Sequence, residues 1–168
     1  MLSIRRLLDK AAHSSFYLWL LNRGVNRMVP FNRPHHFQVT RVTEDSLHIN
    51  VPYRAFNFNH IKGIHACALA TVGELAAGMM LMREFDFSEY RLIMSQLSVD
   101  YFYQAKQAVT AVASLTDTDK QEALGEIATE GKAMIKMAAQ LHDQDNNAIC
   151  TVTTTWQIKP WSAVKTAR

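Results

Sequence analysis

The sequence predicts an α+β protein in which an antiparallel sheet wraps around one long apolar helix. The first observation is a stretch of small, apolar and neutral-polar residues over positions 64–82, interrupted by a single carboxylate, Glu74. The second is a set of segments with strand-like patterns on both sides of that stretch, several joined by short turns. Short turns join antiparallel strands, and a helix without a polar face needs other elements to cover it. Together these patterns predict one sheet folded around one buried helix.

The chain is expected to begin with an amphipathic helix over residues 3–26. Apolar residues recur there at helical spacing, and Gly24 lies near the expected end. Two prolines follow and predict a turn region. We therefore divide the chain into an N-terminal helix and turn, residues 1–30, and a single domain, residues 31–168.

Two strands are expected next, over residues 36–42 and 46–53. The second alternates, with Leu47, Ile49 and Val51 on one face. The three residues between the two segments are few enough for a hairpin connection. After the apolar helix, further strands are expected over residues 91–103, 108–115, 132–143 and 148–160.

A surface helix over residues 118–131 is expected to interrupt these later strands. Thr118 and Gln121 have the spacing of a capping box, and Gly131 suits the end of the helix. Residues 145–147 are Asp-Asn-Asn and predict the turn before the last strand.

The composition narrows the classes of function. The 168 residues have a formal net charge of +3, with lysines and arginines scattered rather than arranged in a stripe between aromatics. Nucleic-acid binding is therefore not expected, whereas diffuse positive charge suits an anionic small molecule. Two cysteines, Cys67 and Cys150, lack CxxC spacing, and His35, His36 and His60 lack ligand-spaced carboxylates. We expect a cytoplasmic protein without a metal or a cofactor.

Four residues around the apolar helix have the spacing of a known family. Asn59, Gly63, His65 and Glu74 stand in this order, with Glu74 nine positions after His65. In this pattern, and in its layout over residues 37–160, the sequence resembles the hotdog-fold thioesterases of the PaaI-like and 4-hydroxybenzoyl-CoA types. The N-terminal helix and the helical insertion make it more similar to an uncharacterised branch of that superfamily.

The resemblance implies a role for each of these residues. Glu74 would act as a general base, or hold the water that attacks a thioester, while His65 would orient the loop. Asn59 would fix the loop or orient the substrate, and Gly63 would lie against the substrate. The apolar setting of Glu74 would raise its pKa toward the range that is useful for acid–base chemistry.

The start of the helix departs from the family pattern. The families carry His-Gly-Gly where this sequence has His65-Ala66-Cys67, and Gly63 falls one place later than their loop glycine. Unpaired amides at a helix N-terminus form an oxyanion-type site, so the amides of Ala66 and Cys67 would polarise a thioester carbonyl. Glycine is often needed where a substrate approaches the backbone, because a Cβ atom would block it.

The same residues also have structural interpretations. Glu74 could be a carboxylate hydrogen-bonded to Asn or Arg at a subunit interface, and Ala66 could simply begin a helix. Cys67 is expected to be a packing residue rather than a nucleophile, since cysteine is among the most buried residue types. Asn57 could replace Asn59 in fixing the loop, and Gly73 is expected to permit close helix–sheet packing.

Two functions follow from these observations. The first is a thioesterase-like hydrolase acting on acyl-CoA or acyl-carrier thioesters. The alternative is a non-catalytic acyl-ligand binding or assembly protein. By the same resemblance we expect a homodimer or a higher oligomer such as a homotetramer, with sheets paired edge to edge and the ligand between subunits. The apolar segment at residues 16–21 is expected to pack on the domain or on a partner subunit rather than on a membrane surface.

Overall fold

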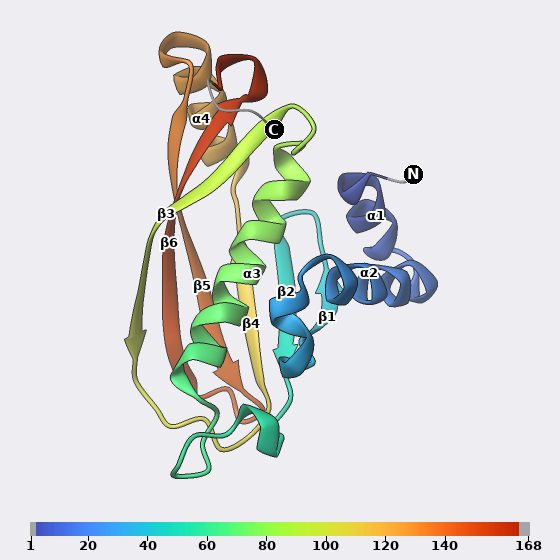
Figure 1. The fold of residues 1–168 in the computed structure, drawn as a ribbon, viewed down its shortest axis with the longest axis vertical. Helices are drawn as coiled ribbons and strands as arrows, with labels where there is room; N and C mark the ends of the chain where they lie inside the picture. The colour runs from blue at the N-terminus through green and yellow to red at the C-terminus, as the bar shows by residue number, and fades with distance from the viewer. Residues whose placement is uncertain (1–2, 165–168) are drawn as a thin grey trace.

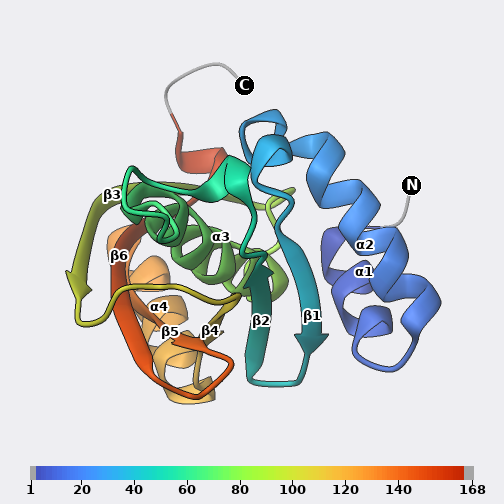
Figure 2. The same cartoon turned by 90° about the horizontal axis from the view of Figure 1, so that it is seen from below.

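The computed structural model describes residues 3–164, so residues 1–2 and 165–168 of the predicted domains lie outside the described residues. A six-stranded sheet curls around one central helix, α3 (Figures 1 and 2). All five strand pairs are antiparallel, in the order β1-β2-β4-β5-β6-β3. The predicted α+β class and antiparallel sheet are therefore confirmed. The strands are β1 (Gln38–Val42), β2 (Ser46–Val51), β3 (Tyr90–Tyr101), β4 (Val109–Ser114), β5 (Ala133–Asp143) and β6 (Ala148–Pro160).

The helices divide into one central helix and others that lie outside the sheet. Helix α3 lies in the concave face of the sheet, while α1 and α2 lie beyond β1, on the side away from β3 (Figure 1). Helix α4 packs against β5. The helices are α1 (Ile4–Ala11), α2 (Ser15–Met28), α3 (Ala66–Glu84) and α4 (Asp117–Glu130), with short 3-10 turns η1 (Pro30–His35), η2 (Ala55–Asn57) and η3 (Trp161–Ala163).

Helix α3 meets the sheet closely because it carries glycine where the two touch. A Cβ atom at Gly73 would lie 2.5 Å from Cβ of Val152 on β6. This confirms the predicted packing role of Gly73. The helix is long and apolar enough to cross a membrane, but 67% of that window is buried, as expected for the core helix of a folded domain.

The prediction that this helix has no open side is wrong. Ala66 and Cys67 are exposed, while Thr71 and Glu74 are only partly buried. These residues recur at helical spacing and form one stripe. The sheet curls around the other sides of α3, and edge strand β3 covers this stripe incompletely.

The N-terminal segment forms two helices rather than the single helix predicted over residues 3–26. Helix α1 ends at Ala11, and α2 begins after Ser14, whose extended backbone places it at the N-cap. Serine favours caps over helix interiors, which explains the break. Helix α2 then continues through Gly24 and ends at Met28, before Pro30.

Helix α2 is joined to the sheet by one side chain. Asn22 donates from Nδ2 to the carbonyl of Val39, 2.9 Å away, and its Oδ1 accepts from the amide of Val39 at 2.8 Å. Val39 belongs to β1, an edge strand whose outer backbone groups would otherwise be unpaired. Leu8 and Leu21 are also fully buried in the main hydrophobic core, so this segment is packed into the rest of the protein.

The remaining boundaries differ from prediction by small steps. His36 has a left-handed backbone with φ of 53°, so β1 begins at Gln38, and β2 ends at Val51 because Pro52 cannot donate to a ladder. The capping box of α4 is formed by Thr116 and Asp119, not by the predicted Thr118 and Gln121. The predicted end of that helix at Gly131 is confirmed, with φ of 72°.

Candidate functional site

A cavity of about 470 Å³ lies along the open stripe of α3. Its walls come from α3, from β3, from Trp156 on β6 and from the segment around η1. Most of the lining is apolar, including Met79, Met82, Leu92 and Leu97. A mostly apolar cavity with few polar groups is typical of a small-molecule site, and these side chains suit an acyl chain.

Glu74 is the carboxylate of this cavity. Among residues 3–164, no side chain or amide hydrogen-bonds or forms an ion pair with it. Burial raises the pKa of Glu74 above the ordinary value of a glutamate, since a low-dielectric setting disfavours the charged form. The carboxyl therefore lines the cavity without a partner among the described residues.

The N-terminus of α3 is capped by its own histidine. His65 is the N-cap, and its Nδ1 accepts from the amide of Cys67 at 3.1 Å. An accepting Nδ1 leaves Nε2 as the donor nitrogen of the ring. Of the two amides predicted to face an oxyanion, that of Cys67 is occupied by this cap. The amide of Ala66 has no such bond within the described part of the chain.

The loop before α3 is fixed by two asparagines. Asn59 Oδ1 accepts from the amides of Ile61 at 3.1 Å and Gly63 at 3.0 Å. Asn57 is buried and donates from Nδ2 to the carbonyls of His35 and Pro52, both at 3.1 Å. Both residues therefore fix the loop by hydrogen bonds to backbone groups. The sequence had left open which of the two does so.

Gly63 is buried and does not line the cavity. A Cβ atom at this position would lie 3.0 Å from Nε2 of Gln104. The structure therefore brings Glu74 and Cys67 together in the cavity, while the loop and the first helical residue lie beyond its end. The four predicted site residues outside the lining are Asn59, Gly63, His65 and Ala66.

The two cysteines have opposite environments. Cys67 is exposed and lines the cavity, so the prediction that it packs in the core is wrong. It lies in the first turn of α3, on the stripe that β3 covers incompletely. Cys150 is buried on β6, and burial raises the pKa of its thiol to about 12.

Asn32 is a lining residue that the sequence analysis missed. It belongs to η1, is 2% exposed and lines the same cavity as Glu74. Its Oδ1 is buried and has no hydrogen-bond partner among the described residues. The sequence showed only a proline-containing turn here, and no local pattern indicates which residue of a turn will point inward.

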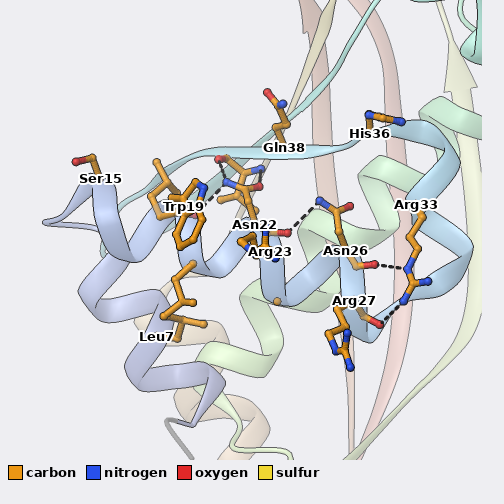
Figure 3. A pocket seen from close by; sticks show the side chains of 14 residues that line it. Leu7, Ser15, Trp19, Asn22, Arg23, Asn26, Arg27, Arg33, His36 and Gln38 are labelled. Atoms are coloured by element: carbon orange, nitrogen blue, oxygen red, sulfur yellow. Dashed lines mark hydrogen bonds between the residues drawn. The ribbon is translucent and has the colours of Figure 1, made fainter.

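A larger hollow of about 1190 Å³ lies between α2 and β1 (Figure 3). Its polar side chains are largely used in holding the backbone. Arg33 donates to the carbonyls of Asn26 at 2.8 Å and Arg27 at 3.2 Å, and Asn26 donates to the carbonyl of Asn22 at 3.0 Å. No carboxylate or cysteine lines it within the described chain. The smaller cavity, which contains Glu74 and Cys67, is therefore the candidate functional site.

Within residues 3–164, no three His, Cys, Asp or Glu side chains gather in a way that could hold a metal ion. His35 instead contacts Asn57, with 2.9 Å between Nδ1 and Oδ1, and stacks on Phe37.

The curled antiparallel sheet around α3 is the hotdog fold. The chain belongs to the family described as a domain of unknown function (DUF4442), whose model matches residues 18–158. A comparison with curated proteins found no match to the sequence.

Several solved structures share the fold at low sequence identity. A Pseudomonas aeruginosa protein described as a probable thioesterase has a TM-score of 0.77 and 21% identity, covering 84% of this chain and 95% of that one. A candidate thioesterase from Shewanella oneidensis has a TM-score of 0.71 and 17% identity, covering 90% and 99%. A thioesterase from Haemophilus influenzae has a TM-score of 0.67 and 11% identity, covering 91% and 97%. These likenesses show a common fold.

Proposed function

We propose that the protein is a hydrolase of acyl-CoA or acyl-carrier thioesters. The observation that carries this proposal is the Glu74 carboxyl, which lies without a protein partner in a mostly apolar cavity and has a raised pKa. A carboxylate of this kind is suited to taking a proton from water. The apolar walls suit the acyl chain, and the names of the structural neighbours point to the same class of reaction.

The reaction needs a base and a group that stabilises the developing oxyanion. Glu74 takes a proton as water attacks the thioester carbonyl carbon. The candidate oxyanion donor is the amide of Ala66, at the positive end of the helix dipole; because Ala66 does not line the cavity, it would act on a thioester held between two subunits. His65 holds the first turn by accepting from the Cys67 amide, and Asn59 holds the preceding loop. These four residues are the site that we assign to hydrolysis.

We further propose that the protein works as a homodimer or a higher oligomer. Strand β3 is a long edge strand with apolar side chains open to solvent, including Ile93 at 50% and Tyr101 at 47% exposure. A long apolar edge is a template for pairing with a second chain. A partner strand would cover β3 and enclose the cavity behind it. Sedimentation velocity should give at least a dimer, and Ile93→Lys should shift it toward monomer.

The test of hydrolysis is a panel of short, medium, long and aromatic acyl-CoA thioesters, followed by thiol release. We expect turnover of one chain class, and a loss of about 10²–10⁴-fold in kcat for Glu74→Gln. The matched control is Glu84→Gln, which makes the same change on the same helix outside the cavity. Rates should fall as the pH drops through the raised pKa of Glu74, because only the ionised carboxylate accepts a proton.

A non-catalytic acyl-binding protein is the second candidate. The occupied Cys67 amide favours it, because one of the two expected oxyanion donors is already used. In that case calorimetry would detect acyl-CoA binding while no member of the panel releases thiol. Binding that is equal in wild type and Glu74→Gln, without turnover, would contradict the hydrolase.

A further inference from the structure

We propose that Asn32, on the N-terminal segment outside the sheet, positions the attacking water together with Glu74. This inference rests on the proposed hydrolase function and adds a residue to its site. Asn32 and Glu74 line one cavity from opposite elements, η1 and α3. The carboxamide is 2% exposed, yet its Oδ1 lacks a hydrogen-bond partner in the described structure.

A buried oxygen without a donor needs an explanation, since nearly all such groups in folded proteins are satisfied. Oδ1 of Asn32 can only accept, so its missing partner must be a donor. Two polar side chains of the cavity already donate elsewhere. The Thr71 hydroxyl donates to the Cys67 carbonyl at 2.8 Å, and the Trp156 indole donates to Thr154 Oγ1 at 2.8 Å. Of the other polar groups of the lining, the Cys67 thiol is a weak donor and Glu74 donates only when it is protonated, so we assign the hydrogen to a bound molecule.

The bound molecule that we assign is a water between the two polar groups. One of its hydrogens is donated to Oδ1 of Asn32, and the other is donated to the carboxylate of Glu74. Its oxygen lone pair is then free to face a thioester carbonyl carbon. Placing a nucleophile by two acceptors fixes its orientation before the reaction begins.

Hydrolysis then proceeds through a tetrahedral intermediate. The water oxygen forms a bond to the carbonyl carbon while Glu74 takes one proton from it. The tetrahedral intermediate then collapses and the carbon–sulfur bond breaks. The proton held by Glu74 passes to the thiolate, so that the products are a carboxylic acid and a free thiol. Asn32 exchanges no proton and is unchanged at the end.

The backbone around Asn32 is held firmly enough for this role. Its amide donates to the carbonyl of Val29 at 3.0 Å, and the neighbouring Arg33 donates to two carbonyls of α2. On the other side, His35 contacts the buried Asn57. A group that orients a reactant must itself be fixed, and these contacts fix both flanks of Asn32.

The experiment compares Asn32→Leu and Asn32→Asp with the control Asn26→Leu. Leucine removes the acceptor at similar volume, and we expect a fall of about 10- to 100-fold in kcat with little change in KM. Aspartate keeps an acceptor oxygen and should retain more activity. It should also move the acidic limb of the kcat profile to higher pH, because a second carboxylate disfavours ionisation of Glu74. Asn26→Leu, outside the cavity, should leave kcat unchanged.

Two results would overturn the proposal. One is an Asn32→Leu enzyme with wild-type kcat. The other is an Asn32→Asp enzyme with an unshifted pH profile, which would mean that Asn32 has only a structural role. Circular dichroism and melting curves establish that each variant is folded, and Asn32→Asp serves as the test where Asn32→Leu does not fold.

If the wild-type protein hydrolyses no thioester, the hydrolase proposal fails. The pairing of Asn32 with Glu74 is then tested by a measurement that does not depend on activity. The Glu74 side-chain carboxyl is then titrated by ¹³C NMR in wild type and Asn32→Asp. A higher midpoint in Asn32→Asp supports the shared water site. An identical midpoint overturns it.

Discussion

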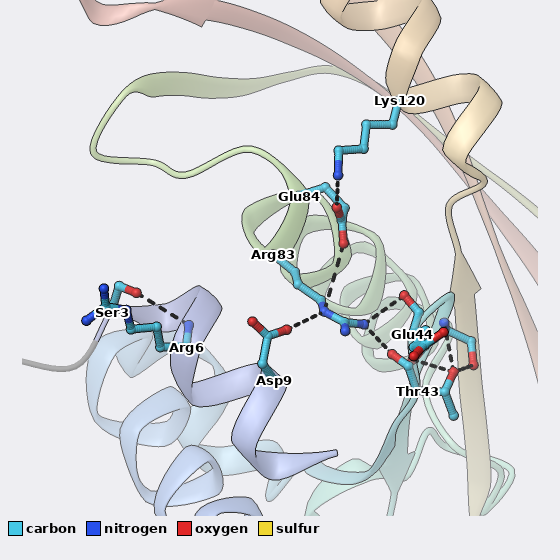
Figure 4. Close-up of polar contacts among 9 residues, drawn as sticks. Ser3, Arg6, Asp9, Thr43, Glu44, Arg83, Glu84 and Lys120 are labelled. Atoms are coloured by element: carbon cyan, nitrogen blue, oxygen red, sulfur yellow. Dashed lines mark hydrogen bonds and ion pairs between the residues drawn. The ribbon is translucent and has the colours of Figure 1, made fainter. Parts of the chain in front are cut away.

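Glu74 and Arg83 are charged side chains of the same apolar helix, nine positions apart, and they differ in their hydrogen-bond partners. Arg83 is 9% exposed, and its guanidinium donates to Asp9 Oδ1 at 3.0 Å, to the Glu44 carbonyl at 2.9 Å and to the Thr43 carbonyl (Figure 4). Glu74 is partly buried and receives no such contact from the described residues.

The middle and the C-terminal end of α3 therefore differ in how a charged side chain is buried. At the C-terminal end, a buried cation is satisfied by α1 and by the β1–β2 turn, and it also complements the negative end of the helix dipole. At the middle of the helix, the Glu74 carboxylate has no partner among the described residues and faces the cavity that Asn32 also lines. A satisfied charge ties elements together, whereas an unsatisfied one is available for a ligand.

The largest effect on stability is expected from Arg83→Met. This change removes three charge-assisted hydrogen bonds between separate elements, and it should lower the free energy of unfolding by about 2–3 kcal/mol. Urea unfolding measures the loss, with exposed Arg6→Met as the control. Hydrolysis per folded molecule should stay at the wild-type value. A loss no greater than that of the control would mean that the Arg83 contacts do not join these elements.

A smaller effect is expected from adding a methyl group to α3 at Gly73. The new Cβ would lie 2.5 Å from Val152, and overpacking of this kind costs about 1–3 kcal/mol, more than the helix propensity gained. Gly78→Ala is the matched variant, because its Cβ would lie 3.1 Å from the Trp156 ring at the cavity wall. We expect Gly78→Ala to change stability less, and to disfavour longer acyl chains. Equal melting temperatures for the two variants would contradict this difference.

The smallest effect on stability is expected from Glu74→Gln, and its sign depends on pH. Burial raises the pKa of Glu74 in the folded protein, so the folded state binds this proton more tightly than the unfolded state. The stabilisation is fully present below the unfolded pKa and is lost as the pH rises through the folded pKa. Glu74→Gln should therefore match wild type below about pH 4 and be slightly more stable at pH 7. Urea unfolding at both pH values measures this, and a less stable variant at pH 7 would reveal a partner for the carboxylate.

Most of the fold could be predicted because its patterns are local. The alternation of Leu47, Ile49 and Val51 places β2 with one face buried, and these three residues are indeed fully buried. The apolar helix was predicted because the stretch over residues 64–82 is apolar, small or neutral-polar apart from a single carboxylate. The break at Ser14 and the capping box at Thr116 were missed, because each depends on which of several neighbouring serines or threonines adopts the cap conformation.

The candidate site was predictable only in part. The resemblance carried by the spacing of His65 and Glu74 indicated which helix would hold the candidate site. Nothing local indicated that Cys67 would be exposed, since its exposure depends on how far β3 covers α3. The position of Asn32 in the cavity could not be predicted for a similar reason, because Asn32 lies 42 positions before Glu74 in the sequence.

By itself, the sequence determined the antiparallel α+β architecture, the buried central helix and the single carboxylate within it, because hydrophobic periodicity acts between neighbours along the chain. Only the tertiary structure decided which polar groups find partners. Arg83 is satisfied and Glu74 is left open because α1, the β1–β2 turn and η1 come to α3 from distant positions. Hydrogen bonds depend on those approaches in space, and no local pattern records them.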